Sequence, residues 1–182
     1  QQMTIKETPL KGLVIIEPKV IKDDRGYFFE SFRKSILTDR GFDLEFVQDN
    51  ESLSNKGTVR GLHLQAPPFG QDKLLRVVRG SIYDVVVDVR KDSNTFGHSY
   101  GIELSGSNNL LFFIPQGFAH GFCCLEDETI VQYKCSNYYN RDSEMGVSWN
   151  DPELQINWPI DNPIVSDKDQ THPPLAEFVS PF

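Results

Sequence analysis

The chain has 182 residues, a formal net charge of −8 and a hydrophobic content of 38%. This length suits one well-packed domain, so we expect a single domain over residues 1–182 with a barrel core at about 45–140. The excess of acidic side chains argues against nucleic acid or an anionic membrane as a partner, because those surfaces are bound by clustered Lys and Arg.

Strand-like segments dominate the chain. Each is rich in β-branched or aromatic residues and is bounded by Gly, Ser, Asn or Pro, which is typical of an all-β sandwich or barrel. In chain order, the predicted strands are residues 13–17, 74–79, 82–89, 99–104, 110–114 and 130–138.

The connections between these strands carry their own signals. Residues 77–83 predict a hairpin with a tight Gly-Ser turn, and residues 105–109 predict a second one. Residues 32–41 have helical spacing, which predicts a short helix beside the barrel. After Tyr139 the prolines exclude long central strands, so we expect a C-terminal tail with short helical turns, packed over the barrel.

Composition also predicts the compartment. The chain has no long apolar run at its start and no stretch that could cross a bilayer, so we expect a cytoplasmic protein without a signal peptide or a transmembrane helix. Cys123, Cys124 and Cys135 give an odd count without CxxC spacing. We therefore expect buried reduced thiols rather than a disulfide framework.

Two segments resemble the paired metal-binding motifs of small cupin barrels. Gly57 stands six positions before His63, and Pro115, Gly117 and His120 have the spacing of the second motif. The resemblance implies a cupin-like jelly-roll β-barrel with short flanking helices.

Two metal-ligand positions of the cupin pattern hold other residues. Gln65, on the same strand face as His63, stands in place of a second histidine, and Lys73 stands in place of a glutamate. A charged lysine does not bind a metal, and two imidazoles are fewer than the three or four ligands that transition metals prefer. We therefore expect acid/base chemistry with no metal and no cofactor.

Nine short motifs together resemble the dTDP-4-dehydrorhamnose 3,5-epimerase family of cupin-fold enzymes. They lie, nearly end to end along the chain, at residues 24–30, 48–52, 60–65, 73–77, 87–90, 115–122, 133–134, 149–152 and 166–169. The resemblance implies a homodimeric isomerase that inverts C3 and C5 of dTDP-4-dehydro-6-deoxy-D-glucose to give dTDP-4-dehydro-L-rhamnose, in dTDP-L-rhamnose biosynthesis. The strand near Val14 is then the candidate for exchange between subunits.

The same resemblance implies four catalytic residues. Inversion beside a ketone needs a base, a donor to the enolate oxygen and an acid on the opposite face. His63 is the expected base, with Asp169 orienting its ring. Lys73 is expected to hold the enolate oxygen, and Tyr133 to return the proton.

Substrate binding is implied for a larger set. Its members are Arg25, Glu30, Gln48, Asn50, Arg60, Lys73, His120, Glu144 and Lys168. Arg25 and Lys168 are expected to bind the diphosphate, for which fork-like guanidinium donors are suited. Stacking on the thymine is a further candidate role for Tyr27, Phe28 and Tyr138, although a core role for these rings and for His120 stays open.

Two other classes of protein remain open from the sequence. One is a metal-dependent cupin such as a dioxygenase or a sugar isomerase, which elemental analysis would identify. The other is a barrel that binds sugar nucleotides or carbohydrates without catalysis, which would not exchange substrate protons with solvent. Within the enzyme class, an epimerase that acts at C3 or C5 alone depends on ring position rather than on residue type.

Overall fold

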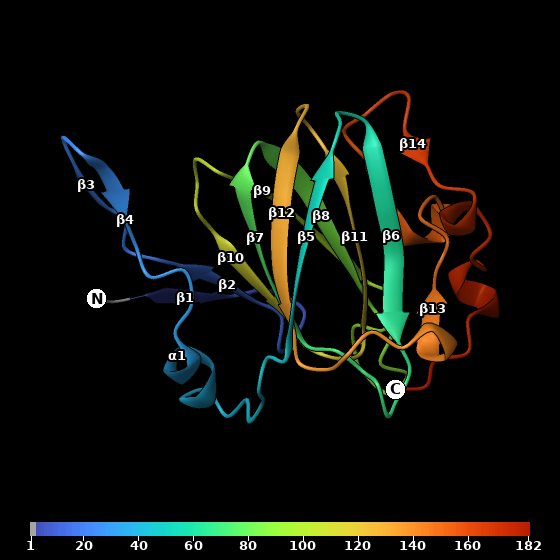
Figure 1. Ribbon diagram of the computed structural model, residues 1–182. Coiled ribbons are helices and arrows are strands. Elements are labelled where there is room, and N and C mark those ends of the chain that lie inside the picture. Colours follow the sequence, from blue (N-terminus) through green and yellow to red (C-terminus); the bar gives the residue numbers. More distant parts are fainter. Residues whose placement is uncertain (1–2) are drawn as a thin grey trace.

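Two β-sheets face each other in the computed structural model, which describes residues 3–182 (Figure 1). The first sheet has, in spatial order, β1 (Thr4–Glu7), β2 (Val14–Glu17), β10 (Leu111–Ile114), β7 (Lys73–Arg79), β12 (Thr129–Cys135) and β5 (Gln48–Ser54). The second has β13 (Glu144–Gly146), β6 (Thr58–Gln65), β11 (Phe118–Cys124), β8 (Ser81–Asp88) and β9 (Ser99–Ser105), with β14 (Ile164–Val165) beside β6. The predicted all-β, cupin-like barrel is confirmed.

The main core lies between the two sheets. Because side chains alternate along a strand, every second residue of β7, β10 and β12 points inward. Leu75, Phe112 and Val131 on these strands are 0% exposed. They belong to one cluster with Val86 and Leu104 of the opposite sheet. At the edge of the first sheet, β5 lines a cavity with the polar residues Gln48, Asn50 and Ser52.

The outer faces of the sheets are covered by other parts of the chain. The tail covers β6 and β11 through Leu154 and Phe178, and it contains the expected short turns at Arg141–Ser143, Pro152–Leu154, Lys168–Gln170 and Leu175–Glu177. The helix α1 (Lys34–Thr38) is shorter than predicted and buries Leu37 against the outer face of the first sheet. Within residues 3–182, no helix has the length and apolar character needed to span a bilayer.

Both predicted hairpins are wrong, although both turns exist. Gly80 adopts a φ of +82° at the first turn. However, β7 pairs with β10 and β12, whereas β8 pairs with β9 and β11. The second turn likewise links β9 to β10 in the other sheet, and Asn108 stabilises it by accepting the N–H of Ser105 and of Leu110. Each turn therefore carries the chain from one sheet to the other.

A small hairpin, β3 (Ile21–Asp23) and β4 (Gly26–Phe28), projects from the barrel on the side away from the C-terminal tail (Figure 1). Its Tyr27 and Phe28 side chains are largely exposed. In contrast, β2, which contains Val14, pairs with β1 and β10 of the same chain. Within one chain, β2 has two strand partners, whereas the β3–β4 hairpin, here named the arm, forms a separate two-stranded sheet among the described residues. Exchange of the strand near Val14 between subunits stays a prediction.

Two glycines let β6 and β11 approach closely. A Cβ atom on Gly61, whose φ is +138°, would lie 2.6 Å from Gly121 Cα. One on Gly121 would lie 2.5 Å from the Arg60 carbonyl oxygen. The strand register shifts at this point, and His63 stands opposite His120. The close approach thus fixes the distance between two strands that carry predicted site residues.

We predict that Gly61→Ala destabilises the fold. The added methyl group would overlap backbone atoms of β11, so the free energy of unfolding should fall by about 1–3 kcal/mol, as for other overpacked sites. Urea unfolding followed by circular dichroism measures the change. Val179→Ala is the control, because Val179 is 80% exposed and its loss should change stability by no more than about 0.5 kcal/mol. Equal midpoints for the two variants would contradict the prediction.

Candidate active site

A cavity of about 270 Å³ opens between the two sheets. Strands β5, β7 and β12 form one wall, and β6, β11 and β13 form the other. Eight of the residues predicted from the sequence line it, namely Gln48, Asn50, Arg60, His63, Lys73, His120, Tyr133 and Glu144. The structure therefore brings together residues that are scattered over much of the sequence.

His63 and Asp169 form a hydrogen-bonded pair at the wall of this cavity. His63 Nε2 lies 2.6 Å from Asp169 Oδ1, and the Gly61 N–H donates to Asp169 Oδ2 at 3.1 Å. Burial opposes ionisation of Asp169, but hydrogen bonds from His172, His63 and Gly61 together hold its pKa well below its usual range. Asp169 is therefore a carboxylate, and the His63 ring nitrogen that remains for other partners is Nδ1.

His172 is a third member of this group that sequence reasoning missed. Its Nε2 lies 3.3 Å from Asp169 Oδ1, and its ring packs edge-on against His63 with centroids 5.7 Å apart. Gly146 makes room for this ring, since a Cβ there would lie 2.4 Å from His172 Nδ1. The three-residue spacing from Asp169 was the available signal. These three side chains place possible metal-ligand atoms within 4.8 Å of one another.

Lys73 and Tyr133 lie together on the opposite wall. The Lys73 Nζ is 5.8 Å from the centroid of the Tyr133 ring. Burial lowers the pKa of Lys73, while the nearby Cys135 and Asp84 oppose that shift. Burial raises the pKa of Tyr133, so its phenol keeps its proton at neutral pH. The pair thus offers an amine and a protonated phenol to the cavity.

His120 is held by Asp84, another residue that sequence reasoning missed. His120 Nε2 lies 2.7 Å from Asp84 Oδ1, and Asp84 is 0% exposed. Burial lowers the pKa of His120 against the opposing effect of Asp84, and burial raises the pKa of Asp84 against His120 and Lys73. The Asp84 Oδ2 atom has no hydrogen-bond partner among the described residues. A charged side chain within an apolar strand was the signal for Asp84.

Arg60 and Lys168, two further predicted residues, have partners at or near the cavity. Arg60 donates to Ser54 Oγ at 3.0 and 3.1 Å, and Lys168 forms an ion pair with Glu144. Tyr138 is 61% exposed and is not among the described residues that line the cavity, whereas its neighbour Tyr139 is. The aromatic segment therefore reaches the cavity through Tyr139, and stacking of Tyr138 on the thymine stays a prediction.

Four predicted residues lie on or beside the arm and not at this cavity. Arg25 pairs with Asp23 at 2.5 Å, and Glu30 pairs with Arg33 at 2.6 Å. Tyr27 and Phe28 are 62% and 65% exposed. Among the residues described for one chain, none of the four lines the cavity around His63.

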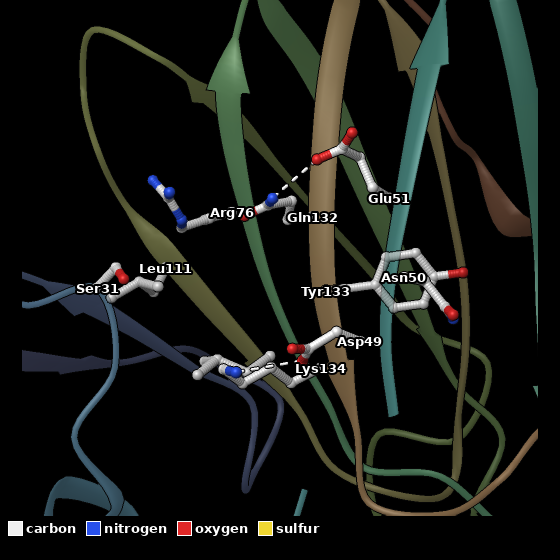
Figure 2. A pocket seen from close by; sticks show the side chains of 10 residues that line it. Ser31, Asp49, Asn50, Glu51, Arg76, Leu111, Gln132, Tyr133 and Lys134 are labelled. Carbon is white, nitrogen blue, oxygen red and sulfur yellow. Dashed lines mark hydrogen bonds and ion pairs between the residues drawn. The ribbon is translucent and has the colours of Figure 1, made fainter. Parts of the chain in front are cut away.

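A second cavity, of about 210 Å³, lies at the outer face of the first sheet. Figure 2 shows two pairs of side chains that join neighbouring strands, in which Gln132 donates to Glu51 and Lys134 donates to Asp49. It contains no histidine, and Lys134 and Asp49 already neutralise each other. The cavity around His63 is therefore the better candidate for acid/base chemistry, because two imidazoles, a phenol and an amine line it together.

Comparisons with known proteins agree with this geometry. The sequence model of the family described as dTDP-4-dehydrorhamnose 3,5-epimerase matches residues 7–177. A protein of that name from Methanothermobacter thermautotrophicus is 49% identical over 174 residues, which is 94% of each chain. A crystal structure of dTDP-6-deoxy-D-glucose-3,5-epimerase from Legionella pneumophila, in complex with dTDP-4-keto-L-rhamnose, has a TM-score of 0.94 at 43% identity and covers 98% of this chain and 95% of that one.

A structure of the Bacillus anthracis dTDP-4-dehydrorhamnose 3,5-epimerase, with TDP and PPi bound, is also similar. It has a TM-score of 0.92 at 49% identity and covers 95% of this chain and 99% of that one. Sequence and structure therefore point to the same family.

We predict that the contribution of Asp169 to stability depends on pH. Its pKa is lowered in the folded state, so the stabilisation is fully present above the unfolded value of about 3.9 and is lost as pH falls toward the folded value. The difference in urea midpoint between the wild type and Asp169→Asn should therefore be largest near pH 6 and should shrink below about pH 4. A difference that does not change with pH would contradict this.

Proposed function

The chain belongs to the dTDP-4-dehydrorhamnose 3,5-epimerase family, and we propose that it epimerises dTDP-4-dehydro-6-deoxy-D-glucose at C3 and C5 in the cavity around His63. Both inversions give dTDP-4-dehydro-L-rhamnose, in dTDP-L-rhamnose biosynthesis. The hydrogen bond between His63 and Asp169, in the cavity that also holds Lys73 and Tyr133, is the observation that carries the proposal.

The first step is removal of a proton beside the ketone. The 4-keto group acidifies C3–H and C5–H, because the resulting carbanion is delocalised onto the carbonyl oxygen. His63 Nδ1 accepts the proton, and Asp169 stabilises the imidazolium that forms. The electron pair of the C–H bond becomes part of the enolate, whose oxygen accepts a hydrogen bond from Lys73.

The second step returns a proton to the other face of the same carbon. We assign this step to Tyr133, because its phenol is protonated and lies across the cavity from the wall that carries His63. The enolate becomes a ketone again, the phenolate regains a proton from water, and His63 loses its proton to water. The same three residues, His63, Lys73 and Tyr133, then repeat both steps at the second carbon. Neither step needs a redox cofactor.

The rest of the substrate requires donors around the rim. Arg60 lies in the cavity beside His63, and Lys168 lies at its edge against Glu144. Cationic side chains there favour the diphosphate and the sugar oxygens. Gln48 and Asn50 supply neutral amides for sugar or base edges, and His120 remains a candidate sugar contact, with Asp84 fixing its ring.

The arm supports a homodimer as part of this proposal. A two-stranded hairpin is marginally stable alone, and exposed aromatic rings mark a contact surface. Arg25 and Glu30, which family resemblance assigns to the substrate, lie away from the cavity of their own chain. In a two-fold symmetric dimer, the arm of one subunit would reach the cavity of the other and complete it with Arg25, Tyr27 and Phe28.

The proposed compartment is the cytoplasm. All three cysteines are buried with free thiols, as the sequence predicted. Free thiols are the usual state of cysteine in a reducing compartment.

The reaction is tested by following deuterium at C3 and C5 by NMR, with dTDP-4-dehydro-6-deoxy-D-glucose and metal-stripped protein in D₂O. We predict label at both carbons with the wild type. His63→Asn should lose exchange at both by on the order of 10²–10⁴-fold, the usual contribution of a general base. Tyr133→Phe should keep more exchange than turnover, because His63 still removes and returns protons on its own face.

Other outcomes would revise the proposal. Label at one carbon would indicate a single-site epimerase. Retained exchange in a folded His63→Asn protein would exclude His63 as the base.

If the arm of one subunit completes the site of the other, two inactive variants should complement each other. Arg25→Ala and His63→Asn should each be nearly inactive alone. After subunit exchange of an equal mixture, half of the dimers are mixed, and one of their two sites combines an intact His63 with the partner's intact arm. About a quarter of the wild-type activity should then return. A mixture that stays inactive, although mass spectrometry shows mixed dimers, would place Arg25 and His63 in the same subunit's site.

A further inference from the structure

We infer that His63, Asp169 and His172 form a binding site for a divalent transition metal such as Zn²⁺, and that metal bound there blocks the reaction. The blocking effect rests on the proposed function, whereas metal binding itself does not. The observation behind it is a group of three ligand atoms, two imidazole nitrogens and one carboxylate oxygen, that lie within 4.8 Å of one another.

The donor set matches the metal. Zinc is bound by histidine nitrogen and carboxylate oxygen at about 2.0–2.1 Å, and three protein ligands suffice when a fourth position is left to water or substrate. Nε2 of His63 and of His172 both face the same oxygen, Asp169 Oδ1. The second carboxylate oxygen is already held by the Gly61 N–H, so Oδ1 is the oxygen presented to the metal.

The distances need only small adjustment. Ligand atoms around a tetrahedral zinc ion are about 3.3 Å apart, given the bond lengths. The His172 Nε2 to Asp169 Oδ1 distance is already 3.3 Å, and the His63 Nε2 to Asp169 Oδ1 distance is 2.6 Å. The ligand nitrogens of His63 and His172 lie within 4.8 Å of each other. Rotations of the two rings that open the shorter distance and bring these nitrogens closer by no more than about 1.5 Å would therefore complete the set.

The site is open to solvent through one of its members. The side chain of His63 is 33% exposed, while those of Asp169 and His172 are 7% and 12% exposed. An ion can thus enter from the cavity, and two of its three ligands already lie in buried positions. Gly146 supports this arrangement, because the absence of a side chain there allows the His172 ring to lie beside Asp169.

Bound metal would change the proton on the base. In the metal-free pair, His63 Nε2–H donates to Asp169, and the lone pair on Nδ1 is available for the substrate proton. When a metal takes the lone pair of Nε2, the neutral ring carries its proton on Nδ1 instead. Nδ1 then has no lone pair, so His63 no longer accepts a proton from C3 or C5.

The first test measures binding without substrate. Metal-free protein is titrated with Co²⁺, whose visible absorption reports tetrahedral coordination, and Zn²⁺ is then added to displace it. We expect one Co²⁺ per chain for the wild type and for His98→Gln, a control that removes a histidine outside the group. His172→Gln should bind on the order of tenfold more weakly or worse. No stoichiometric Co²⁺ binding to the wild type would overturn the inference, whatever the variants do.

The second test measures the block. Each protein is assayed at one fixed substrate concentration, so that chelation by the diphosphate is the same for all, and each rate is divided by that protein's own metal-free rate. We expect Zn²⁺ to inhibit the wild type and His98→Gln alike, EDTA to restore both, and His172→Gln to need on the order of tenfold more Zn²⁺. Equal inhibition of His172→Gln would overturn the inference. If no protein epimerises the substrate, the proposed function fails, while the Co²⁺ titration still decides the metal site.

Discussion

The carboxylate of Asp169 is the point on which the site depends. It accepts hydrogen bonds from the His63 ring and from the Gly61 backbone, and it is 106 residues away from His63 in the sequence. Through these bonds the tail is fixed to β6 beside His63, the proposed base. Loss of the carboxylate would therefore affect both the orientation of the imidazole and the attachment of the tail. The same carboxylate thus serves both the fold and the proposed reaction.

Around Lys73, burial and neighbouring charges shift the pKa values of Lys73, Asp84 and His120 in opposite directions. Lys73 is half-buried, and burial lowers its pKa. Asp84 and His120 are buried beside it, each with its own cost of ionisation, and each is partly compensated by a neighbour. The hydrogen bond between His120 and Asp84 holds both side chains in place, because a buried polar group that moved would lose its partner without gaining water.

Much of this arrangement follows from the sequence, and the exceptions have physical causes. Strand periodicity and motif spacing placed His63 and its neighbours on inner faces, since alternation is a local property. The turns at Gly80 and at 105–109 were misread because turn chemistry does not say which sheet the next strand joins. Asp84 was missed because its role comes from His120, 36 residues away in the sequence. His172 contacts Asp169 locally, but its place beside His63 depends on contacts across the fold. The sequence also does not show which subunit the arm contacts, because such contacts lie far apart in the chain or between chains.

The room that Gly146 leaves for His172 has an evolutionary consequence. A Cβ at position 146 would lie 2.4–2.5 Å from atoms of the imidazole ring, so a larger residue at 146 is compatible only with a different or displaced side chain at 172. In a set of natural variants, the two positions should change together, as contacting pairs do. Chains that have lost the glycine would then also have lost the second histidine beside the aspartate.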